Sequence, residues 1–414
     1  MKAVIDKVLK KIKPTPTEIK KFRRITTQFL KKLGKIKDTK AVLGGSGEKN
    51  TWLSNSHDID IFVLFDSKKH LETNLSDYLE EHLKKLFPKI QRLHGSRDYF
   101  QINYQSYLFE VVPILKITKS KEAQNITDIS PLHAQWVKKH KKLADDIRLA
   151  KQFTKAVNCY GAESYITGFS GYVMEILTIY YQSFENLITA AAQWENRDII
   201  DVEKHYKTRL DVFKDINKSK LQSPLIIIDP VDKNRNAAAA LSMEKFLLFK
   251  RKAQEFLDNP HVKNFEKQKL DFNTLEKTTR YNLVYLELTP LIGKIDVIGT
   301  KLLKVFQYFQ QKLPEFGLLE DGWDWNLENK AQFYFILEKR TIDPFVIKQG
   351  PPLKMEEAVK NFQKKNKNTV FEKNKRLFAK IPFKHNNLQD FIKETLKDNY
   401  IKERIKAVKI VKFG

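Results

Sequence analysis

The sequence predicts an α+β multidomain protein, and three observations predict this class. The chain has 414 residues, more than a typical single domain. Helix and strand patterns alternate in residues 1–141 and again in residues 258–414, whereas residues 142–257 read mainly as helices. We therefore expect a mixed sheet with helices packed on it, a helical middle domain, and a second α+β unit that ends in a basic tail.

The first 65 residues predict helices followed by strands. Residues 1–37 read as basic amphipathic helices interrupted at "KPTPTEI", with Thr15 or Thr17 as the N-cap of the second helix. "AVLGGSGEKN" predicts a short strand, a glycine turn and the start of a helix. "DIDIFVLF", residues 58–65, is β-branched and aromatic on both faces, which is typical of a central strand.

The rest of the first domain and the middle domain follow from similar patterns. "LSDYLEEHLKKLF" predicts an amphipathic helix, and "YFQINYQSYLFEVVPIL" predicts a hairpin whose second strand ends at Pro113. Residues 130–161 read as helical, with Ser130 as an N-cap before Pro131. Residues 170–194 predict one long helix or a helix pair, and residues 223–257 predict a strand, a polar turn and a helix.

The last third predicts strands at residues 280–289, 331–340 and 344–352, with helices between and after them. Residues 361–414 contain 15 Lys and Arg against 5 Asp and Glu, a net charge of +10. Because Lys and Arg bind phosphates, we expect this tail to contact a polyanion, with Lys373, Lys375 and Arg376 as the candidate residues.

The charge and the cysteine count limit the partners. The formal net charge of +25 favours a polyanionic partner, either nucleic acid or an anionic membrane, although a basic surface also serves solubility. A single cysteine excludes an intramolecular disulfide and a cysteine-based zinc site. Neither a signal-peptide core nor a membrane span is present in the sequence, so we expect a cytoplasmic protein with no membrane partner.

Three carboxylates predict a metal site. Asp58 and Asp60 are two residues apart in a strand, so their side chains share one face, where like charges repel unless a cation lies between them. An acidic turn before a strand is the alternative. Glu110 interrupts the apolar run "YLFEVVPIL", where a charge is costly unless it is paired or bound to metal. If the two strands are neighbours, the carboxylates converge on Mg²⁺; otherwise Glu110 faces solvent on an edge strand.

The glycine turn "GGS" predicts a site for phosphate. Gly44, Gly45 and Ser46 let backbone N–H groups approach a phosphate closely, and Lys49 supplies positive charge between this turn and Asp58. Many such sequences are plain turns, so this signal depends on the carboxylates beside it.

Together these motifs resemble the DNA polymerase β-type nucleotidyltransferase superfamily, with its Gly-Ser turn, spacer, Asp-x-Asp strand and later carboxylate. "GGS…TWL…DIDIFVLF", "EVVP", "SPLH", "YGAE…GFSGY…EIL" and "DPVD…RN" look like the archaeal (class I) CCA-adding tRNA nucleotidyltransferases, in the same order. The resemblance is dense over residues 40–260 and looser in the last third. It implies a catalytic nucleotidyltransferase palm at 1–141, a helical nucleotide-pocket domain at 142–257, and a C-terminal α+β RNA-binding unit at 258–414.

The resemblance also implies roles for single residues. Two Mg²⁺ ions would be held by Asp58, Asp60 and Glu110, and one carboxylate would help to deprotonate the tRNA 3′-hydroxyl. The residues expected to contact ATP or CTP are Gly45, Ser46, Lys49, His133, Lys151, Tyr160 and Arg235. Without the resemblance, His133 is interpreted as a polar residue in a first helical turn, Lys151 as a solvated lysine, Tyr160 as a packing aromatic and Arg235 as a surface residue.

Three positions depart from the family pattern. Lys49 stands where Arg is common, so it keeps the positive charge but cannot bind a phosphate in the bidentate manner of Arg. Glu110 stands where Asp is usual, and Ile129 precedes Ser130 where Arg is expected. These departures concern geometry and rate, and they leave the reaction class unchanged.

We therefore expect a transferase that adds C, C and A to the tRNA 3′ end from CTP and ATP, releasing pyrophosphate. The resemblance further implies a homodimer. A poly(A) polymerase or oligoadenylate synthetase with the same signature is the alternative enzyme. A catalytically inactive RNA-binding protein on this fold is the alternative from another class.

Overall fold

The computed structural model forms two compact units, Met1–Gln268 and Lys269–Gly414. The division into three domains that we predict from the sequence stays a prediction. The residues that the structure describes are 1–56, 58–66, 69, 74–267, 272–382 and 385–413.

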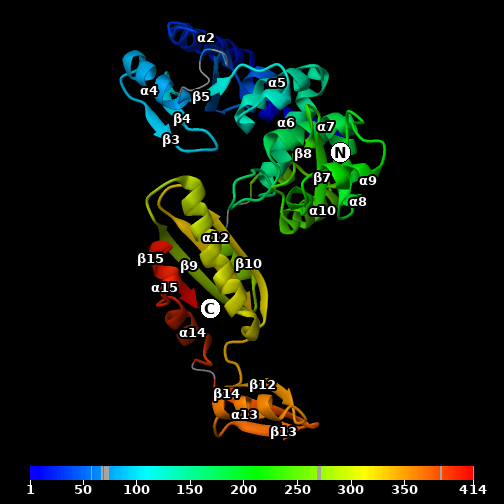
Figure 1. The fold of residues 1–414 in the computed structure, drawn as a ribbon, viewed down its shortest axis with the longest axis vertical. Coiled ribbons are helices and arrows are strands. Elements are labelled where there is room, and N and C mark those ends of the chain that lie inside the picture. The colour runs from blue at the N-terminus through cyan, green and yellow to red at the C-terminus, as the bar shows by residue number, and fades with distance from the viewer. Residues whose placement is uncertain (57, 67–68, 70–73, 268–271, 383–384, 414) are drawn as a thin grey trace. The chain divides into compact units, whose positions relative to one another are not determined.

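The first unit begins with a five-stranded mixed sheet in the order β1-β2-β5-β4-β3 (Figure 1). β2 and β5 pair in parallel, and the other neighbours pair antiparallel. The strands are β1 (Thr39–Leu43), β2 (Asp58–Phe65), β3 (Gln91–Leu93), β4 (Tyr99–Tyr104) and β5 (Tyr107–Leu115). The helices here are α1 (Lys2–Ile12), α2 (Pro16–Leu33), α3 (Gly45–Lys49), α4 (Leu75–Leu86) and α5 (Ser130–Lys138).

One face of this sheet is covered by α2 and α4. Ile59, Ile61, Phe109 and Val111 are at most 2% exposed and share a core with apolar residues of both helices. Because side chains alternate along a strand, Asp58, Asp60 and Glu110 project from the opposite face. Burial of the first face thus fixes the register that displays the carboxylates.

The predicted break between the first helices is confirmed. Thr15 caps α2 in a capping box: its hydroxyl accepts from the backbone N–H of Glu18, whose carboxylate accepts from the Thr15 backbone. Val8 of α1 packs in the core of the mainly helical segment that follows the first sheet in the chain, so α1 belongs to that core.

Two sequence predictions in this region are wrong. β5 does not end at Pro113 but runs to Leu115, with Pro113 opposite Val63. The pairing of β4 with β5 stops at Val111. Beyond this residue β5 pairs only with β2, so Pro113 interrupts no hydrogen bonds to β4. Ser130 is not the N-cap of α5; it is the first helical residue, because a 3₁₀ turn leads directly into the helix through Ile129.

The following segment is mainly helical, as expected, and also holds a small sheet in the order β6-β7-β8. Residues 170–194 form a pair of helices and not one long helix. Gln182 adopts a left-handed conformation that ends the first helix, and Ser183 caps the second. The elements are α6 (Ala144–Ala156), α7 (Gly171–Tyr181), α8 (Phe184–Gln193), β6 (Asp198–Ile200), α9 (Arg209–Asp215), β7 (Leu225–Asp229), β8 (Asp232–Asn236) and α10 (Met243–Asp258).

The second unit contains two antiparallel sheets, ordered β10-β11-β9-β15 and β12-β14-β13. The three predicted strands correspond to β9, β11 and β12, whereas β10, β13, β14 and β15 were not predicted. The elements are α11 (Phe272–Thr278), β9 (Asn282–Pro290), α12 (Ile295–Lys312), β10 (Leu318–Trp325), β11 (Ala331–Leu337), β12 (Phe345–Pro352), α13 (Glu356–Lys365), β13 (Val370–Lys373), β14 (Arg376–Pro382), α14 (Leu388–Thr395), α15 (Asn399–Lys402) and β15 (Ile405–Phe413).

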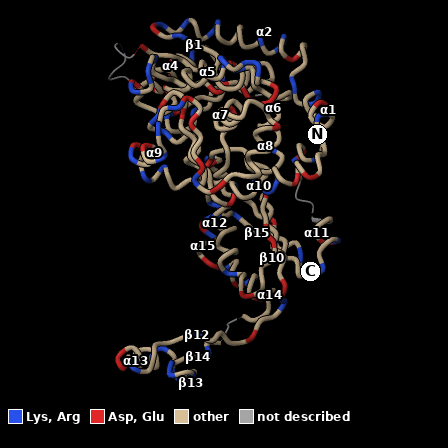
Figure 2. The backbone as a smooth tube through the Cα atoms, turned by 90° about the vertical axis from the view of Figure 1, so that its right-hand side faces the viewer, with Lys and Arg blue, Asp and Glu red and all other residues tan. Residues whose placement is uncertain are grey.

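The basic tail is therefore folded into these sheets. β15 pairs with β9, and β13 and β14 form a hairpin whose turn residues Asn374 and Lys375 have φ of 53° and 54°. Lys and Arg occur along this hairpin as well as throughout the first unit (Figure 2). In the described part of the chain, no helix is long and apolar enough to cross a membrane.

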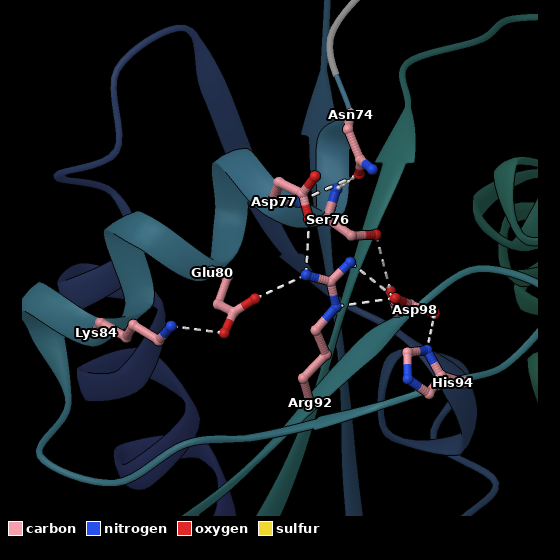
Figure 3. Close-up of polar contacts among 8 residues, drawn as sticks. All are labelled: Asn74, Ser76, Asp77, Glu80, Lys84, Arg92, His94 and Asp98. Atoms are coloured by element: carbon pink, nitrogen blue, oxygen red, sulfur yellow. Dashed lines mark hydrogen bonds and ion pairs between the residues drawn. The ribbon is translucent and has the colours of Figure 1, made fainter.

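A cluster of charged side chains fixes α4 to the β3–β4 end of the first sheet (Figure 3). The Arg92 guanidinium contacts Asp77 and Glu80 at 2.7 Å and Asp98 at 2.8 Å. Asp98 also accepts from the imidazole of His94 at 2.8 Å. We call these residues the Arg92 cluster; it ties together a helix, an edge strand and the loop between β3 and β4.

Candidate active site

The pairing of β2 with β5 brings the predicted carboxylates to one face of the sheet. Asp60 lies directly opposite Glu110, and Asp58 precedes Asp60 by two residues on the same face. Asp58 is exposed, and Asp60 and Glu110 are partly buried. Gln101 of β4, opposite Glu110 on its other side, donates a hydrogen bond of 2.8 Å to the Glu110 carboxylate.

The electrostatics of these groups favour a bound cation. Burial raises the pKa of Asp60; Lys49 and Lys151 oppose this rise, and the nearby Asp58 adds to it. Burial also raises the pKa of Glu110, opposed by the Gln101 hydrogen bond and reinforced by both aspartates. Negative charge on this face is thus incompletely compensated by the protein.

The donor chemistry of the three carboxylates fits a hard divalent ion such as Mg²⁺. Within the described residues, however, no three Asp, Glu, His or Cys side chains are gathered closely enough to hold a metal ion as they stand. The assignment of Asp58, Asp60 and Glu110 as metal ligands therefore stays a prediction.

The glycine turn lies against the face of the sheet that displays Asp58, Asp60 and Glu110, which we call the carboxylate face. The backbone N–H of Gly44 donates to the carbonyl of Asp60 at 2.8 Å. Gly45 has a φ of +50°, and a Cβ there would lie 1.6 Å from an Asp60 carboxylate oxygen. Only glycine fits this position, so the turn meets Asp60 through bare backbone. Ser46 follows in α3, and Lys49 ends this short helix.

Lys49 and Lys151 converge on a buried carboxylate that we did not predict. The ammonium groups of Lys49 and Lys151 each contact one oxygen of Glu175 at 2.6 Å. The Thr51 hydroxyl donates to Glu175 at 2.9 Å and accepts from Lys151 at 2.9 Å. The side chain of Glu175 is 0% exposed, and those of Lys49 and Lys151 are 11% and 5% exposed. We call these four residues the Glu175 cluster.

The ionisation of the Glu175 cluster follows from its composition. Burial alone would raise the pKa of Glu175, but Lys151 and Lys49 outweigh it and lower that pKa to about 2. Burial lowers the pKa of Lys151 to about 8, with Glu175 opposing the shift and Lys49 adding to it. With both lysines charged, the cluster holds one more positive than negative charge in a buried position.

His133 and Arg235 converge on a second buried carboxylate, that of Asp229. His133 Nε2 lies 3.0 Å from Asp229, Arg235 donates to it at 2.5 Å, and the Tyr172 hydroxyl donates to it at 3.1 Å. Burial would raise the pKa of Asp229, but His133 and Arg235 lower it to about 2. The rings of His133 and Tyr172 stack with centroids 4.0 Å apart. We call these four residues the Asp229 cluster.

The two clusters are linked by α7. Tyr172 and Glu175 are three residues apart on this helix, and the Lys49 ammonium lies 5.9 Å from the Tyr172 ring centroid. Two corrections to the sequence prediction follow. Arg235 lies in strand β8, where we predicted a polar turn between a strand and a helix. Lys151 is not a solvated lysine, because it is 4% exposed and paired with Glu175.

Tyr160 lies beside the N-terminus of α7. A Cβ on Gly171 would lie 2.6 Å from the Tyr160 hydroxyl and 3.7 Å from Lys151 Cε, so the absence of a side chain at Gly171 leaves room for both. Burial raises the pKa of Tyr160. The Lys155 ammonium lies 5.0 Å from the Tyr160 ring centroid, and burial lowers its pKa while Asp58 opposes the shift.

The residues predicted to contact RNA lie in the second unit. Lys373 pairs with Arg376 across the β13–β14 hairpin, and Lys375 lies in its turn. Lys373 and Lys375 are exposed, and Arg376 is partly buried. Ile129 of the first unit, where the family pattern has Arg, is 4% exposed and is a packing residue.

Glu175 and Asp229 are the functional candidates that sequence reasoning missed. Both sit in apolar runs, "YVMEILTIYY" and "LIIIDP", and both segments belong to the motifs quoted above. A charge in an apolar run needs a partner, and this is as true of these two residues as it is of Glu110. The signal was present, but the identity of the partner depends on tertiary contacts.

Two family models match adjoining parts of the chain. The nucleotidyltransferase domain model matches residues 23–144, and the model of the tRNA nucleotidyltransferase second domain matches residues 145–266. With the carboxylate face, the glycine turn and the Glu175 cluster, they define the class: this protein is a nucleotidyltransferase.

Whole-chain comparison gives the particular family. The CCA-adding enzyme of Nanoarchaeum equitans is 40% identical over 75% of this chain and 76% of its own length. The CCA-adding enzyme of Thermococcus gammatolerans is 30% identical over 97% of this chain and 90% of its own length. The chain therefore belongs to the CCA-adding enzymes. Nucleotidyltransferases of this kind use nucleoside triphosphates and a divalent metal ion.

Solved structures agree on the fold. The Cid1 poly(U) polymerase matches with a TM-score of 0.51 and 16% identity over 64% of this chain and 98% of its own. A cytoplasmic RNA terminal U-transferase matches with a TM-score of 0.50 and 17% identity over the same shares. At this identity the likeness concerns the fold alone.

Proposed function

We propose that this protein adds C, C and A to the 3′ end of tRNA from CTP and ATP, with release of pyrophosphate. One observation carries the assignment to this chain's own residues. The Lys49 and Lys151 ammonium groups of the Glu175 cluster lie close enough to the carboxylate face to oppose the rise in the pKa of Asp60 that burial causes. A triphosphate between them would meet lysines on one side and metal-binding carboxylates on the other.

In this proposal each group has a distinct task. Asp58, Asp60 and Glu110 would hold two Mg²⁺ ions, which activate the attacking oxygen and stabilise the leaving one. Lys49, Lys151, Ser46 and the Gly45 backbone bind and orient the triphosphate, with Tyr160 against the same wall. His133 and Arg235, held by Asp229, face the nucleotide and contribute to the choice of base.

The second unit is proposed to hold the tRNA. Double-helical RNA is recognised mainly by shape and by binding of its phosphates, which suits the exposed lysines of the β13–β14 hairpin. We also propose a cytoplasmic location and a homodimer. Light scattering coupled to size exclusion tests the dimer directly, since a mass close to 48.7 kDa would rule it out.

An incorporation assay tests the activity. Purified protein is incubated with tRNA that lacks its 3′ end, with one labelled triphosphate at a time and then with CTP and ATP together. Ordered use of CTP followed by ATP supports CCA addition. Use of ATP alone identifies a poly(A) polymerase-like enzyme. Absence of incorporation, with tRNA still bound, identifies an inactive RNA-binding protein.

A further inference from the structure

We propose that Glu175 is a positioning residue for the triphosphate: it holds Lys49 and Lys151, from two different helices, together at one phosphate-binding position. This inference rests on the proposed function and deepens it. Glu175 touches neither the reacting atoms nor the triphosphate in this proposal. It acts through the two lysines.

The geometry places Glu175 between elements far apart in the sequence. It lies on α7, Lys49 ends α3, and Lys151 lies on α6. Each ammonium takes a different carboxylate oxygen, both at 2.6 Å. Because Lys49 follows the turn that meets Asp60, the same contact also ties the glycine turn to the helical segment.

The surroundings show that this carboxylate is not a surface ion pair. Met174 and Ile176, its chain neighbours, are 0% exposed, as is Glu175 itself. Burying a charge is costly unless it is paired and hydrogen bonded. Glu175 therefore has a full set of partners. Among the described residues it is the carboxylate that pairs directly with Lys49 and Lys151, while Asp60 also acts on both lysines. A triphosphate would supply further negative charge to the two ammonium groups.

An alternative role for Glu175 is that of a competitor that occupies the place of the phosphate. The charges around Lys151 argue against this. The groups that act on it are Lys49 from α3, Lys155 from its own helix and Glu175 from α7, and Lys151 in turn acts on Asp60 of β2. Glu175 is the anion that contacts Lys151 directly. Without it, two buried ammonium groups would face one another, and one would lose its proton and its value as a phosphate ligand.

The test compares Glu175→Gln with the wild type and with Glu185→Gln, which removes an exposed carboxylate from the adjacent α8. Binding of CTP and of inorganic triphosphate is measured by calorimetry without tRNA, from pH 6 to pH 9. Glu175→Gln should weaken both ligands roughly 10- to 100-fold at pH 7.5, as expected for losing a charge-assisted interaction. Lowering the pH should restore part of the affinity, because protonation returns the lost ammonium. Glu185→Gln should bind as the wild type, and tRNA affinity should be unchanged in both.

Triphosphate affinity equal to or tighter than the wild type in folded Glu175→Gln would overturn the proposal. If that variant does not fold, Thr51→Val provides the second test, since it removes only the hydroxyl that bridges Lys151 and Glu175. It should weaken triphosphate binding about two- to fivefold, and unchanged affinity would overturn the proposal. A wild type that adds no nucleotide to tRNA would instead refute the proposed function, whatever the variants bind.

Discussion

The Glu175 cluster and the Arg92 cluster use the same kind of ion pair in opposite surroundings. In both, cations and carboxylates meet at 2.6–2.8 Å. The Arg92 cluster is accessible to water: the side chains of Asp77 and His94 are 60% and 77% exposed, and those of Arg92, Glu80 and Asp98 are 26%, 22% and 20% exposed. This cluster has more carboxylates than guanidinium groups, and water and salt ions screen the excess negative charge. The Glu175 cluster is buried, so its imbalance persists until a ligand arrives.

This comparison indicates that burial, and not the length of the ion pairs, distinguishes the proposed binding site at the Glu175 cluster from the structural role of the Arg92 cluster. Exposed ion pairs contribute about 0–1 kcal/mol each and are screened by salt. The Arg92 cluster therefore fixes α4 to the sheet with little consequence for chemistry. A buried group of unbalanced charge is costly to the fold, and in the proposed function a bound triphosphate offsets that cost.

The largest expected effect is at the carboxylate face. Asp60→Ala should reduce nucleotide incorporation on the order of 10²-fold or more, the range that loss of one catalytic group costs. Binding of tRNA should remain nearly intact, because its affinity comes mainly from phosphates bound elsewhere. Single-turnover incorporation and filter binding measure the two effects. A variant that keeps full turnover would remove Asp60 from the proposed site; Asp58→Ala and Glu110→Gln should behave alike.

The next largest effect is expected at the Asp229 cluster, on the choice of nucleotide more than on the rate of incorporation. Asp229→Asn leaves an amide where His133, Tyr172 and Arg235 met a carboxylate. Misplacing such groups by about 1 Å can cost up to about 10²-fold. We expect CTP and ATP use to fall unequally on tRNAs that end before each position, with more GTP or UTP incorporated. Equal losses with strict rejection of GTP and UTP would argue for a purely structural role.

The pH dependence of triphosphate binding sharpens the comparison further. Burial lowers the pKa of Lys151 to about 8, so in the free protein its ammonium is present below that pH and lost above it. Triphosphate affinity should therefore decline as pH rises past about 8, by at most about tenfold per pH unit. Calorimetry from pH 7 to pH 9.5 measures the decline. A constant affinity across this range would show that Lys151 does not contact the phosphates.

Exposed cations of the second unit should act through salt-dependent affinity alone. Replacing Lys373, Lys375 and Arg376 by Ala should flatten the dependence of tRNA binding on salt, by about 0.7–0.9 in log–log slope for each phosphate that is no longer bound. The Michaelis constant for tRNA should rise while turnover at saturating tRNA changes little. An unchanged slope in filter binding would place the tRNA elsewhere.

The smallest expected effect is at the Arg92 cluster. Arg92→Ala should lower the free energy of unfolding on the order of 1 kcal/mol, and by less at high salt. Triphosphate affinity should not change. Lys84→Ala, which removes only one exposed pair with Glu80, is the matched control and should have a smaller effect still. A loss of triphosphate binding in Arg92→Ala would show that the two clusters are coupled.

The sequence by itself determined the local features of this protein. The capping box of Thr15 and Glu18, the apolar strand behind Asp58 and Asp60, and the glycine turn depend on residues within a few positions of one another. Their physical causes, which are capping, alternation of side chains and bare backbone, act over that same distance. These features, with the quoted motifs, were sufficient to predict the class of enzyme.

Other features depended on neighbours that no local pattern names. Pro113 stays within β5 because β4 has already ended beside it, and Arg235 is held in a strand that pairs with β7. The strands β13, β14 and β15 lie in a lysine-rich stretch, where the alternation of apolar and polar residues is difficult to recognise. Such outcomes depend on which strand or helix provides the opposing surface.

Only the tertiary structure decided which charges meet. The sequence could indicate that Glu175 and Asp229 need partners, because each is an acid in an apolar run. It could not say that Lys49, 126 residues away, and Lys151 would share one of them, or that His133 and Arg235 would share the other. The reason is physical: the cost of burying a charge is fixed by the residue itself, whereas its compensation comes from groups that only folding brings within hydrogen-bonding distance.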